Sequence, residues 1–485
     1  MGQQNPGTVQ AYIDETPVWN DGTPVTVAPM TRMQWSIWWL ATAGKFFEGM
    51  IIFMTGVALP LIMLEFDLDA TEKGMVGAAS LLGILVGATA LGGLADYLGR
   101  KQMFVSEMVL LVIFLVLAAL SGSFAWLVVF LFGIGLALGC DYPTAHMVIS
   151  ESIPSKFRGR LVLGAFAFQA VGALAGTVLG YLILNFGGTE KDWRLMYASA
   201  IVPAILVGIG RLFIPQSSHW LMEKRKITAA ERALKRLLHR KPIYPKKIEL
   251  NETTAVDTGD QTKGSKLRLL FSKKYRRATL FASLPWFFQD LGTYGIGIFT
   301  PIILVTTLGS TQGHRNLASV VHDDMLAAKG AALIDVLLIV GILLAVVLAD
   351  KVGRIKLQII GFIGCAAGLL IAAVSFHFEG PTKIVLIFAG FMLFNFMTNL
   401  GPNAMTYLLA GEVFPTHIRG LGSGFAASFG KVGAVTTAFL FPILLQDIGT
   451  ETLLLILVGT SLLGAAVTWR YRIETTGVNL ETIGQ

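Results

Sequence analysis

The sequence predicts an all-α membrane protein with twelve transmembrane helices, arranged as two similar six-helix bundles. Three observations predict this fold: an apolar composition, an apolar run of spanning length that recurs along the chain, and two loop motifs that each occur twice. Of the 485 residues, 54% are hydrophobic and 14% are charged. Soluble domains are about 45–50% apolar and about 25% charged. Lipid is therefore expected to solvate most of the chain.

The apolar runs define the predicted helices, because a helix needs about 20 mainly apolar residues to cross the hydrocarbon core of a bilayer. Twelve segments meet this requirement: 35–63, 74–95, 102–121, 124–149, 161–185, 194–214, 277–306, 327–349, 357–376, 383–410, 421–446 and 450–470. The polar stretch 215–276 separates six helices from six. The predicted organisation is an N-terminal tail (1–34), a first bundle (35–214), a central loop (215–276), a second bundle (277–470) and a C-terminal tail (471–485).

Basic residues predict the orientation of the chain in the membrane. They gather in the central loop and in the short loops that contain Arg100, Arg158, Arg354 and Arg419. Because Lys and Arg are retained on the inner side of membranes, the side of the protein with these loops is predicted to be cytoplasmic, and both termini with it. The predicted location is the plasma membrane, which the chain crosses several times. The same retention explains the net charge of +7, so membrane lipid is the expected surrounding and no nucleic-acid partner is expected. The chain is expected to act as a monomer.

Two loop motifs repeat at nearly the same offset. The first is Asp96-Tyr-Leu-Gly99-Arg100 and then Asp350-Lys-Val-Gly353-Arg354; the second is Glu151-x-x-Pro154-x-x-x-Arg158-Gly159 and then Glu412-x-x-Pro415-x-x-x-Arg419-Gly420. Corresponding loops of two parallel halves explain this repetition, and that geometry places a substrate site near the membrane midplane between the halves. We expect the Asp96/Arg100 and Glu151/Arg158 groups to form interhelical charge pairs that hold one access state closed. For any single loop, positive-inside charge alone is the alternative.

Charged residues inside the predicted helices need a partner or a function, because a charge at mid-membrane costs about 3 kcal/mol even on insertion scales. The candidates are Lys45, Glu48, Asp141, Asp290, Asp335 and Lys431. Lys45 and Glu48 are three positions apart and can neutralise each other across one helical turn, so a structural and a functional interpretation both stay open. Asp335 is interpreted as structural.

Polar side chains gather on predicted helices of both halves. Trp286, Asp290 and Tyr294 recur every four positions and so share one helix face. Asp141 and Tyr142 precede a proline that loosens their helix. Further polar groups are Gln169, Asn403 and Lys431. Together these residues offer many hydrogen-bond donors and few acceptors, which suits a tetrahedral oxyanion.

The chain resembles the major facilitator superfamily over almost its whole length, through Gly93-Leu-Ala-Asp96-Tyr-Leu-Gly99-Arg100-Lys101. More narrowly, it resembles the phosphate:proton symporters through Asp141-Tyr-Pro, Trp286-Phe-Phe-x-Asp290-x-x-x-Tyr294, Gly401-Pro-Asn403 and Gly430-Lys431-Val-Gly433. This resemblance implies that phosphate is bound by Tyr142, Gln169, Trp286, Asp290, Tyr294, Asn403 and Lys431. It also implies proton coupling through Asp141 and Asp290, and Glu48 stands near the position where the family carries aspartates.

The sequence therefore predicts a secondary active transporter that couples proton entry to the uptake of inorganic phosphate or a similar small anion by alternating access. A proton-coupled transporter of a sugar or small organic anion is the first alternative, favoured by His146 and by sugar-porter motifs at Pro215-Gln-Ser-Ser-His219 and Glu474-Thr-Thr-Gly477. A membrane receptor that does not transport is the second. Neither an enzyme nor a cofactor or metal is expected, because no nucleophile–base spacing and no metal-ligand cluster stands out.

Overall fold

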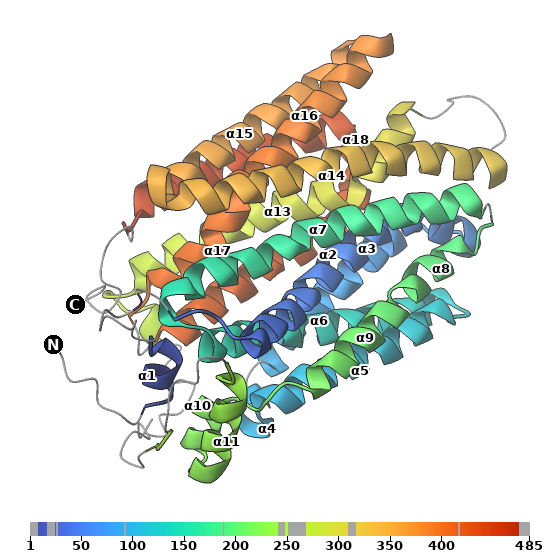
Figure 1. Cartoon of the computed structure of the whole chain (residues 1–485). Coiled ribbons are helices and arrows are strands. Elements are labelled where there is room, and N and C mark those ends of the chain that lie inside the picture. The colour runs from blue at the N-terminus through green and yellow to red at the C-terminus, as the bar shows by residue number, and fades with distance from the viewer. Residues whose placement is uncertain are drawn as a thin grey trace.

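The computed structural model describes residues 8–16, 25, 28–91, 94–187, 189–240, 248–250, 268–308, 317–415 and 418–474. In these ranges the secondary structure is helical, and long helices run side by side through the molecule (Figure 1). Helices of the first half are α2 (Arg32–Phe66), α3 (Ala70–Val86), α4 (Leu94–Leu98), α5 (Arg100–Ala119), α6 (Phe124–Ser152), α7 (Ser155–Phe186), α8 (Asp192–Ser199) and α9 (Ile201–Leu212). A π-helical turn, Gly87–Leu91, follows α3.

The second half has the same number of spans. Its helices are α13 (Arg276–Leu308), α14 (Leu317–Val352), α15 (Arg354–Val374), α16 (Gly380–Leu400), α17 (Pro402–Glu412) and α18 (Arg419–Tyr471), with a 3₁₀ turn at Ser375–His377. Helix α18 contains two spans, since its backbone breaks at Gly449 with φ of 77°. With α8 and α9 forming one span, and α16 and α17 another, the described helices give the predicted twelve-helix fold.

Two helices begin six or more residues before their apolar runs. Helix α14 begins at Leu317 rather than at 327, and α7 begins at Ser155 rather than at 161. In each case the added residues include charged side chains, such as Asp323 and Arg158. Hydropathy marks the part of a helix that lies in lipid, whereas backbone hydrogen bonding continues beyond it.

The backbone conformation explains why both copies of the first motif have a glycine before the arginine. Gly99 and Gly353 have φ of 105° and 95°, and each is the N-cap residue of the helix that follows, α5 or α15. Residues with a Cβ atom rarely adopt this backbone conformation, so glycine is required at both turns. The two halves therefore share a local backbone geometry as well as a motif.

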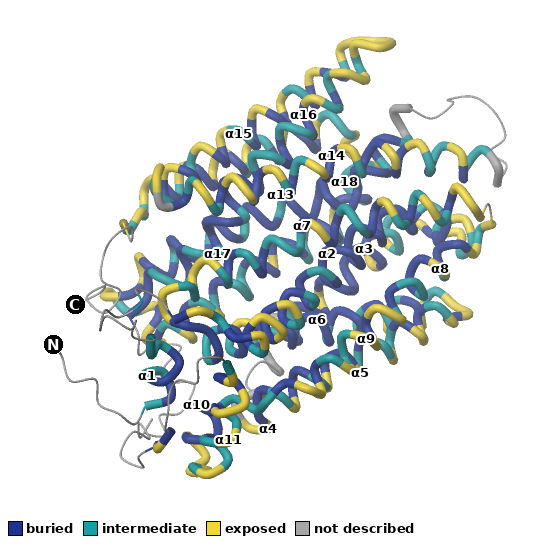
Figure 2. The backbone as a smooth tube through the Cα atoms, viewed as in Figure 1, coloured by how far each residue is buried: buried dark blue, intermediate teal, exposed yellow. Residues whose placement is uncertain are grey.

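Burial separates the central helices from the peripheral ones. In the most apolar stretch of α2, 83% of the residues are buried, compared with 28% in the span formed by α8 and α9. Figure 2 shows this contrast, with exposed positions along the outer helices and buried positions along α2 and α13. Many exposed residues on the outer helices are large and apolar, for example Leu206 on α9 and Leu343 on α14. Lipid is the solvent that suits such a surface.

Helices α2 and α7 approach closely through small residues. A Cβ atom at Gly49 would lie 2.0 Å from the carbonyl oxygen of Gln169, and one at Gly176 would lie 2.2 Å from that of Met50. Close helix contacts in membranes depend on small residues of this kind. Because glycine has no side chain, α2 and α7 come close enough for Gln169 of α7 to contact Glu48 of α2.

Three short helices lie at one end of the bundle (Figure 1): α1 (Val9–Asp14), α10 (Ser218–Glu223) and α11 (Ile227–Leu237). The Thr31 hydroxyl donates to the Leu237 carbonyl over 2.7 Å and also accepts from the backbone N–H of Gln34. Part of the predicted N-terminal tail is therefore folded against the central segment.

Candidate functional site

Three charged side chains from both halves meet in the middle of the bundle. The Nζ atom of Lys431 on α18 lies 3.4 Å from Oδ2 of Asp290 on α13 and 3.5 Å from Oε1 of Glu48 on α2. All three residues are buried, with at most 7% of their surface exposed. Because buried ionised groups are tolerated only with partners, Lys431 serves as the partner of both carboxylates in a cluster between the halves.

Tyr294 and Gln169 complete the hydrogen bonding of this cluster. The Tyr294 hydroxyl lies 2.5 Å from Nζ of Lys431 and donates to Glu48 Oε1 over 3.2 Å. The Gln169 amide lies 3.1 Å from the Tyr294 hydroxyl and 3.3 Å from Glu48 Oε1. Helices α2 and α7 of the first half and α13 and α18 of the second half therefore contribute to one polar network, which we call the central network.

Lys45 adds a second cation to the central network. Its Nζ atom lies 2.5 Å from Oε2 of Glu48, one helical turn away on α2. Among the described residues, the network thus combines two ammonium groups (Lys45 and Lys431) with two carboxylates (Glu48 and Asp290). The charges balance, and an incoming anion would compete with the carboxylates for the ammonium groups.

Aromatic side chains lie beside the central network. Trp286 is buried against Gly430, where a Cβ atom would lie 2.5 Å from its ring. Its ring meets Tyr407 of α17 edge-on, with centroids 6.3 Å apart, and Tyr407 stacks on Phe166 of α7 with centroids 4.7 Å apart. Nζ of Lys45 lies 5.7 Å from the centre of the Phe166 ring. Sequence reasoning missed Tyr407 and Phe166, because aromatic residues on membrane helices usually only pack.

Not every predicted ligand joins this network. The Asn403 amide donates to Asn399 over 2.6 Å, and Asn403 lies one turn from Tyr407 on α17. The side chain of Tyr142 lies outside the described residues. Of the seven predicted ligands, the structure brings together Gln169, Trp286, Asp290, Tyr294 and Lys431.

Asp141 belongs to a different cluster within the first half. Nη2 of Arg211 on α9 lies 2.5 Å from Oδ1 of Asp141, and Nη1 lies 3.4 Å from Oε2 of Glu107 on α5. Arg211 and Glu107 have no exposed surface. Both residues escaped the sequence analysis, although a charge within an apolar run was a signal that could have found them.

The repeated loop motifs pair with each other in each half. Nε of Arg100 lies 3.2 Å from Oε1 of Glu151, and Arg354 forms the corresponding ion pair with Glu412. The pairs thus join an arginine of the first motif to a glutamate of the second, across helices. Arg419 donates from Nε to the Phe414 carbonyl over 3.1 Å, and Arg158 lies close to His219. The side chains of Asp96 and Asp350 lie outside the described residues.

Asp335 of α14 joins the two halves at another point. It accepts from the Thr177 hydroxyl of α7 over 2.8 Å and from the Asn395 amide of α16 over 3.3 Å. These two hydrogen bonds satisfy the buried carboxyl group of Asp335, which forms no ion pair with a described residue. This arrangement agrees with the structural interpretation of Asp335.

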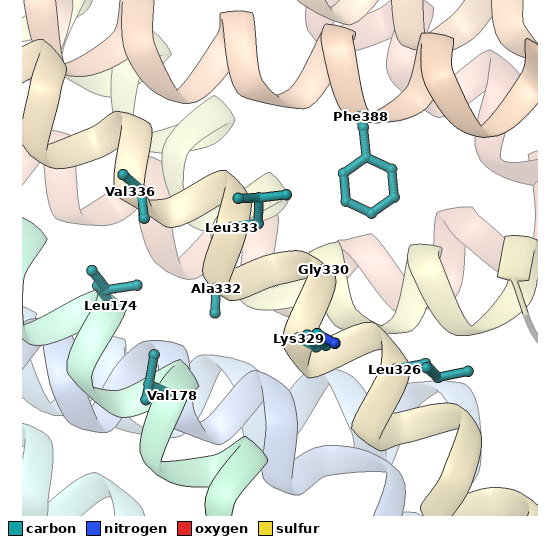
Figure 3. Close-up of a pocket in the computed structure, with 9 residues that line it drawn as sticks. All are labelled: Leu174, Val178, Leu326, Lys329, Gly330, Ala332, Leu333, Val336 and Phe388. Atoms are coloured by element: carbon teal, nitrogen blue, oxygen red, sulfur yellow. The ribbon is translucent and has the colours of Figure 1, made fainter.

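An apolar groove of about 610 Å³ lies between α7, α14 and α16 (Figure 3). Its lining includes Leu174, Leu333, Val336 and Phe388, and Lys329 contributes its one charged side chain. Several of these side chains are exposed on the outer surface of the bundle, so lipid chains suit the groove better than a small polar solute. Within the described ranges, no group of three His, Cys, Asp or Glu residues is placed to hold a metal ion.

Comparison with known proteins decides the family. The profile of the family described as "Sugar (and other) transporter" matches residues 35–485. The chain belongs to this family. It is therefore a multi-pass membrane transporter of the major facilitator superfamily, and not an enzyme. The resemblance inferred from the loop motifs is confirmed.

Members and structural neighbours of the family transport different solutes. The glucose transporter GlcP of Staphylococcus epidermidis is 28% identical over 88% of this chain and 91% of its own length. A probable inorganic phosphate transporter 1-12 of rice is 28% identical over 84% of this chain and 81% of its own. The partially occluded inward-open structure of the xylose transporter XylE of Escherichia coli has a TM-score of 0.74 and 20% sequence identity to this chain. The match covers 93% of this chain and 100% of the XylE chain. This neighbour shows the shared fold.

Proposed function

We propose that this transporter imports inorganic phosphate or a similarly small anion together with protons, by alternating access. The observation that carries the proposal is the position of Lys431, whose ammonium group meets Asp290, Tyr294 and Glu48 at the junction of both halves. A cation at this position, surrounded by hydroxyl, amide and indole donors, suits an oxyanion. Similarity to a probable phosphate transporter over most of both chains supports the same substrate class.

Proton coupling follows from the balance of charges in the central network. When an anion binds to the ammonium group of Lys431, Asp290 loses its nearest counter-ion while it remains buried. A buried carboxylate without a cation is costly, so proton binding to Asp290 accompanies anion binding. By linkage, each ligand then strengthens the binding of the other. Rocking of the two halves exposes this composite site to one side of the membrane at a time.

A small organic anion is the second candidate, and the aromatic side chains favour it. Beside the central network, the Tyr407 ring contacts Phe166 on one side and Trp286 on the other. Such rings stack on planar or ring-shaped solutes better than on phosphate. Sugars belong to the same alternative, since GlcP is a similarly close relative.

Uptake into proteoliposomes distinguishes these candidates. Labelled phosphate is offered with an inward proton gradient, and unlabelled phosphate, glucose and benzoate compete. The proposal expects uptake that the gradient accelerates and that only phosphate competes away. Competition by benzoate would move the assignment to an organic anion, and competition by glucose would move it to a sugar. Unchanged uptake after the gradient is collapsed would remove the proton from the mechanism.

A further inference from the structure

The apolar groove between α7, α14 and α16 has walls from both halves of the chain. Leu174 and Val178 of α7 form one wall, and Leu333 of α14 and Phe388 of α16 form the other. Figure 3 shows Ala332 of α14 pointing toward α7. Val178 and Leu333 have 37% and 55% of their surface exposed, so the groove opens onto the outer surface of the bundle, where lipid is the solvent.

Lys329 is the charged side chain among the described residues that line this groove. It is exposed, and it forms no ion pair or hydrogen bond with a described residue. The residues one turn away from it on α14 are Met325, Leu326, Ala332 and Leu333, which carry no charge. A cation on a lipid-facing surface needs a counter-ion or water. Its partner must therefore come from outside the groove lining.

The position of Lys329 along α14 places its ammonium group at the level of lipid head groups. Lys329 precedes Val352, the last residue of α14, by 23 positions. This is about 34 Å of helix at a rise of about 1.5 Å per residue, and the hydrocarbon core of a bilayer is about 30 Å thick. When the end of α14 beside the Gly353–Arg354 turn lies at one membrane surface, Lys329 reaches the other. From there the groove runs two helical turns inward, to Val336.

We infer that the groove binds one anionic phospholipid, whose phosphate group pairs with Lys329 and whose acyl chain lies between Leu174, Leu333 and Val336. The head group supplies the negative charge that Lys329 lacks among the described residues, and a lysine near the membrane surface can extend its ammonium group to meet it. The ammonium group alone would attract any phosphate. The apolar walls favour a phosphate that carries a hydrocarbon chain, because burial of that chain adds to the affinity.

Occupation of this groove depends on the relative position of the two halves. One wall belongs to α7 of the first half, and the other belongs to α14 and α16 of the second. Thr177 and Asp335, which neighbour Val178 and Val336 in the sequence, form a 2.8 Å hydrogen bond between the halves at the same level. Movement of one half against the other therefore changes the width of the groove, and a bound lipid stabilises the arrangement that it fits best. The inference holds whichever solute the protein carries.

Photo-crosslinking in lipid vesicles tests this site. The protein is reconstituted in phosphatidylcholine with a small fraction of phosphatidylglycerol that carries a diazirine on one acyl chain, and mass spectrometry identifies the labelled segments. Labelling is expected on α7 and α14, in the segments that contain Leu174 and Val336. Lys329→Gln is expected to lower it about fivefold, the effect of one basic residue near a membrane surface. The same diazirine on zwitterionic phosphatidylcholine is expected to label the unmodified protein about fivefold less.

Lys191→Gln is the matched control, because Lys191 is an exposed lysine at the start of α8 and lies outside the groove, so labelling is expected to stay unchanged. Ala332→Phe fills the groove and is expected to reduce labelling by both lipids. Unchanged labelling in Ala332→Phe or in Lys329→Gln would overturn the inference. Equal labelling of the unmodified protein by the two lipids would do the same without any variant. Displacement of the labelled lipid by inorganic phosphate would show that Lys329 binds free phosphate instead of a head group.

Discussion

Lys431 and Glu48 lie 3.5 Å apart, although one belongs to the second half of the chain and the other to the first. Neither residue is exposed by more than 7%. A contact between two buried ionised groups ties the relative position of the halves to the charge state of the site. Any ligand that separates the pair also changes the energy of the contact between the halves, and a transporter with alternating access needs such a link.

Lys431→Ala tests the anion site. The substitution removes the ammonium group that Asp290 and Tyr294 contact, and it leaves the network with a net negative charge. Charge-assisted hydrogen bonds contribute about 1.5–3 kcal/mol, so phosphate uptake is expected to fall by about 10- to 100-fold or more. Initial rates of labelled phosphate uptake measure the effect. Lys383→Ala, at the start of α16, is the control that should keep the normal rate; equal rates in both variants would exclude Lys431 as the anion contact.

Asp290→Asn tests proton coupling at the central network. Without this carboxylate, Lys431 is no longer held by Asp290 and an anion can bind without a proton being taken up. Exchange of phosphate across the membrane is therefore expected to continue, while acceleration by a proton gradient is lost. The ratio of gradient-driven uptake to counterflow measures the change. Lys383→Ala, at the start of α16, is the control and is expected to retain the acceleration. Retained acceleration in Asp290→Asn would show that the coupling proton binds elsewhere.

Helical periodicity explains which parts of the site could be predicted from the sequence. Asp290 and Tyr294 lie four positions apart, and the structure places both beside Lys431. Spacing along one helix determines which side chains share a face, so this part of the pattern is readable without coordinates. Hydropathy likewise locates the spans, because the thickness of the bilayer fixes their length.

Contacts between helices could not be predicted in the same way. The sequence analysis grouped Glu151 with Arg158, whereas in the structure Glu151 pairs with Arg100 from another motif. Which charged groups meet depends on how each helix is rotated about its axis, and loop spacing does not encode that rotation. The same reason explains why Arg211 and Glu107 were not recognised as partners of Asp141. Each residue lies on a different helix, and only packing brings them together.

Gly49→Ala tests the close contact between α2 and α7. The added methyl group would lie 2.0 Å from the carbonyl oxygen of Gln169, so the helices must separate. Overpacking of this kind costs about 1–3 kcal/mol, and the shift also moves Gln169 away from Glu48. A lower thermal unfolding midpoint in detergent is expected. Gly459→Ala on α18 is the control, because nothing lies within 4 Å of its Cβ position. Equal midpoints for the two variants would contradict the packing argument.

A charge swap tests the pairing of the repeated motifs. Arg354→Glu places two acids together, and Glu412→Arg places two bases together. Each single variant is expected to shift the balance of access states, while the double variant restores it, with a coupling energy of about 1 kcal/mol for this partly exposed pair. Alkylation of a cysteine introduced at Tyr407 reports access to the site. A double variant that behaves as the sum of the singles would rule out a direct pair.

His219 of α10, in the central segment, makes the stability of the folded protein depend on pH. Burial, together with the nearby Arg158 guanidinium, lowers the pKa of His219 to about 4, and its Nδ1 atom has no hydrogen-bond partner within the described residues. In the unfolded chain the pKa is about 6.5, so below that pH the unfolded state binds a proton that the folded state excludes. Stability is therefore lost as pH falls from about 6.5 toward 4, by about 2 kcal/mol at pH 5.

Thermal unfolding at pH 7 and pH 5 measures this loss. His219→Gln removes the titrating group, so its unfolding midpoint is expected to fall less between the two pH values than that of the unmodified protein. His377→Gln is the matched control, because the His377 side chain is exposed rather than buried, and this variant is expected to keep the pH dependence of the unmodified protein. If His219→Gln and the unmodified protein lose the same stability on acidification, His219 is not held neutral by burial and another group causes the acid sensitivity.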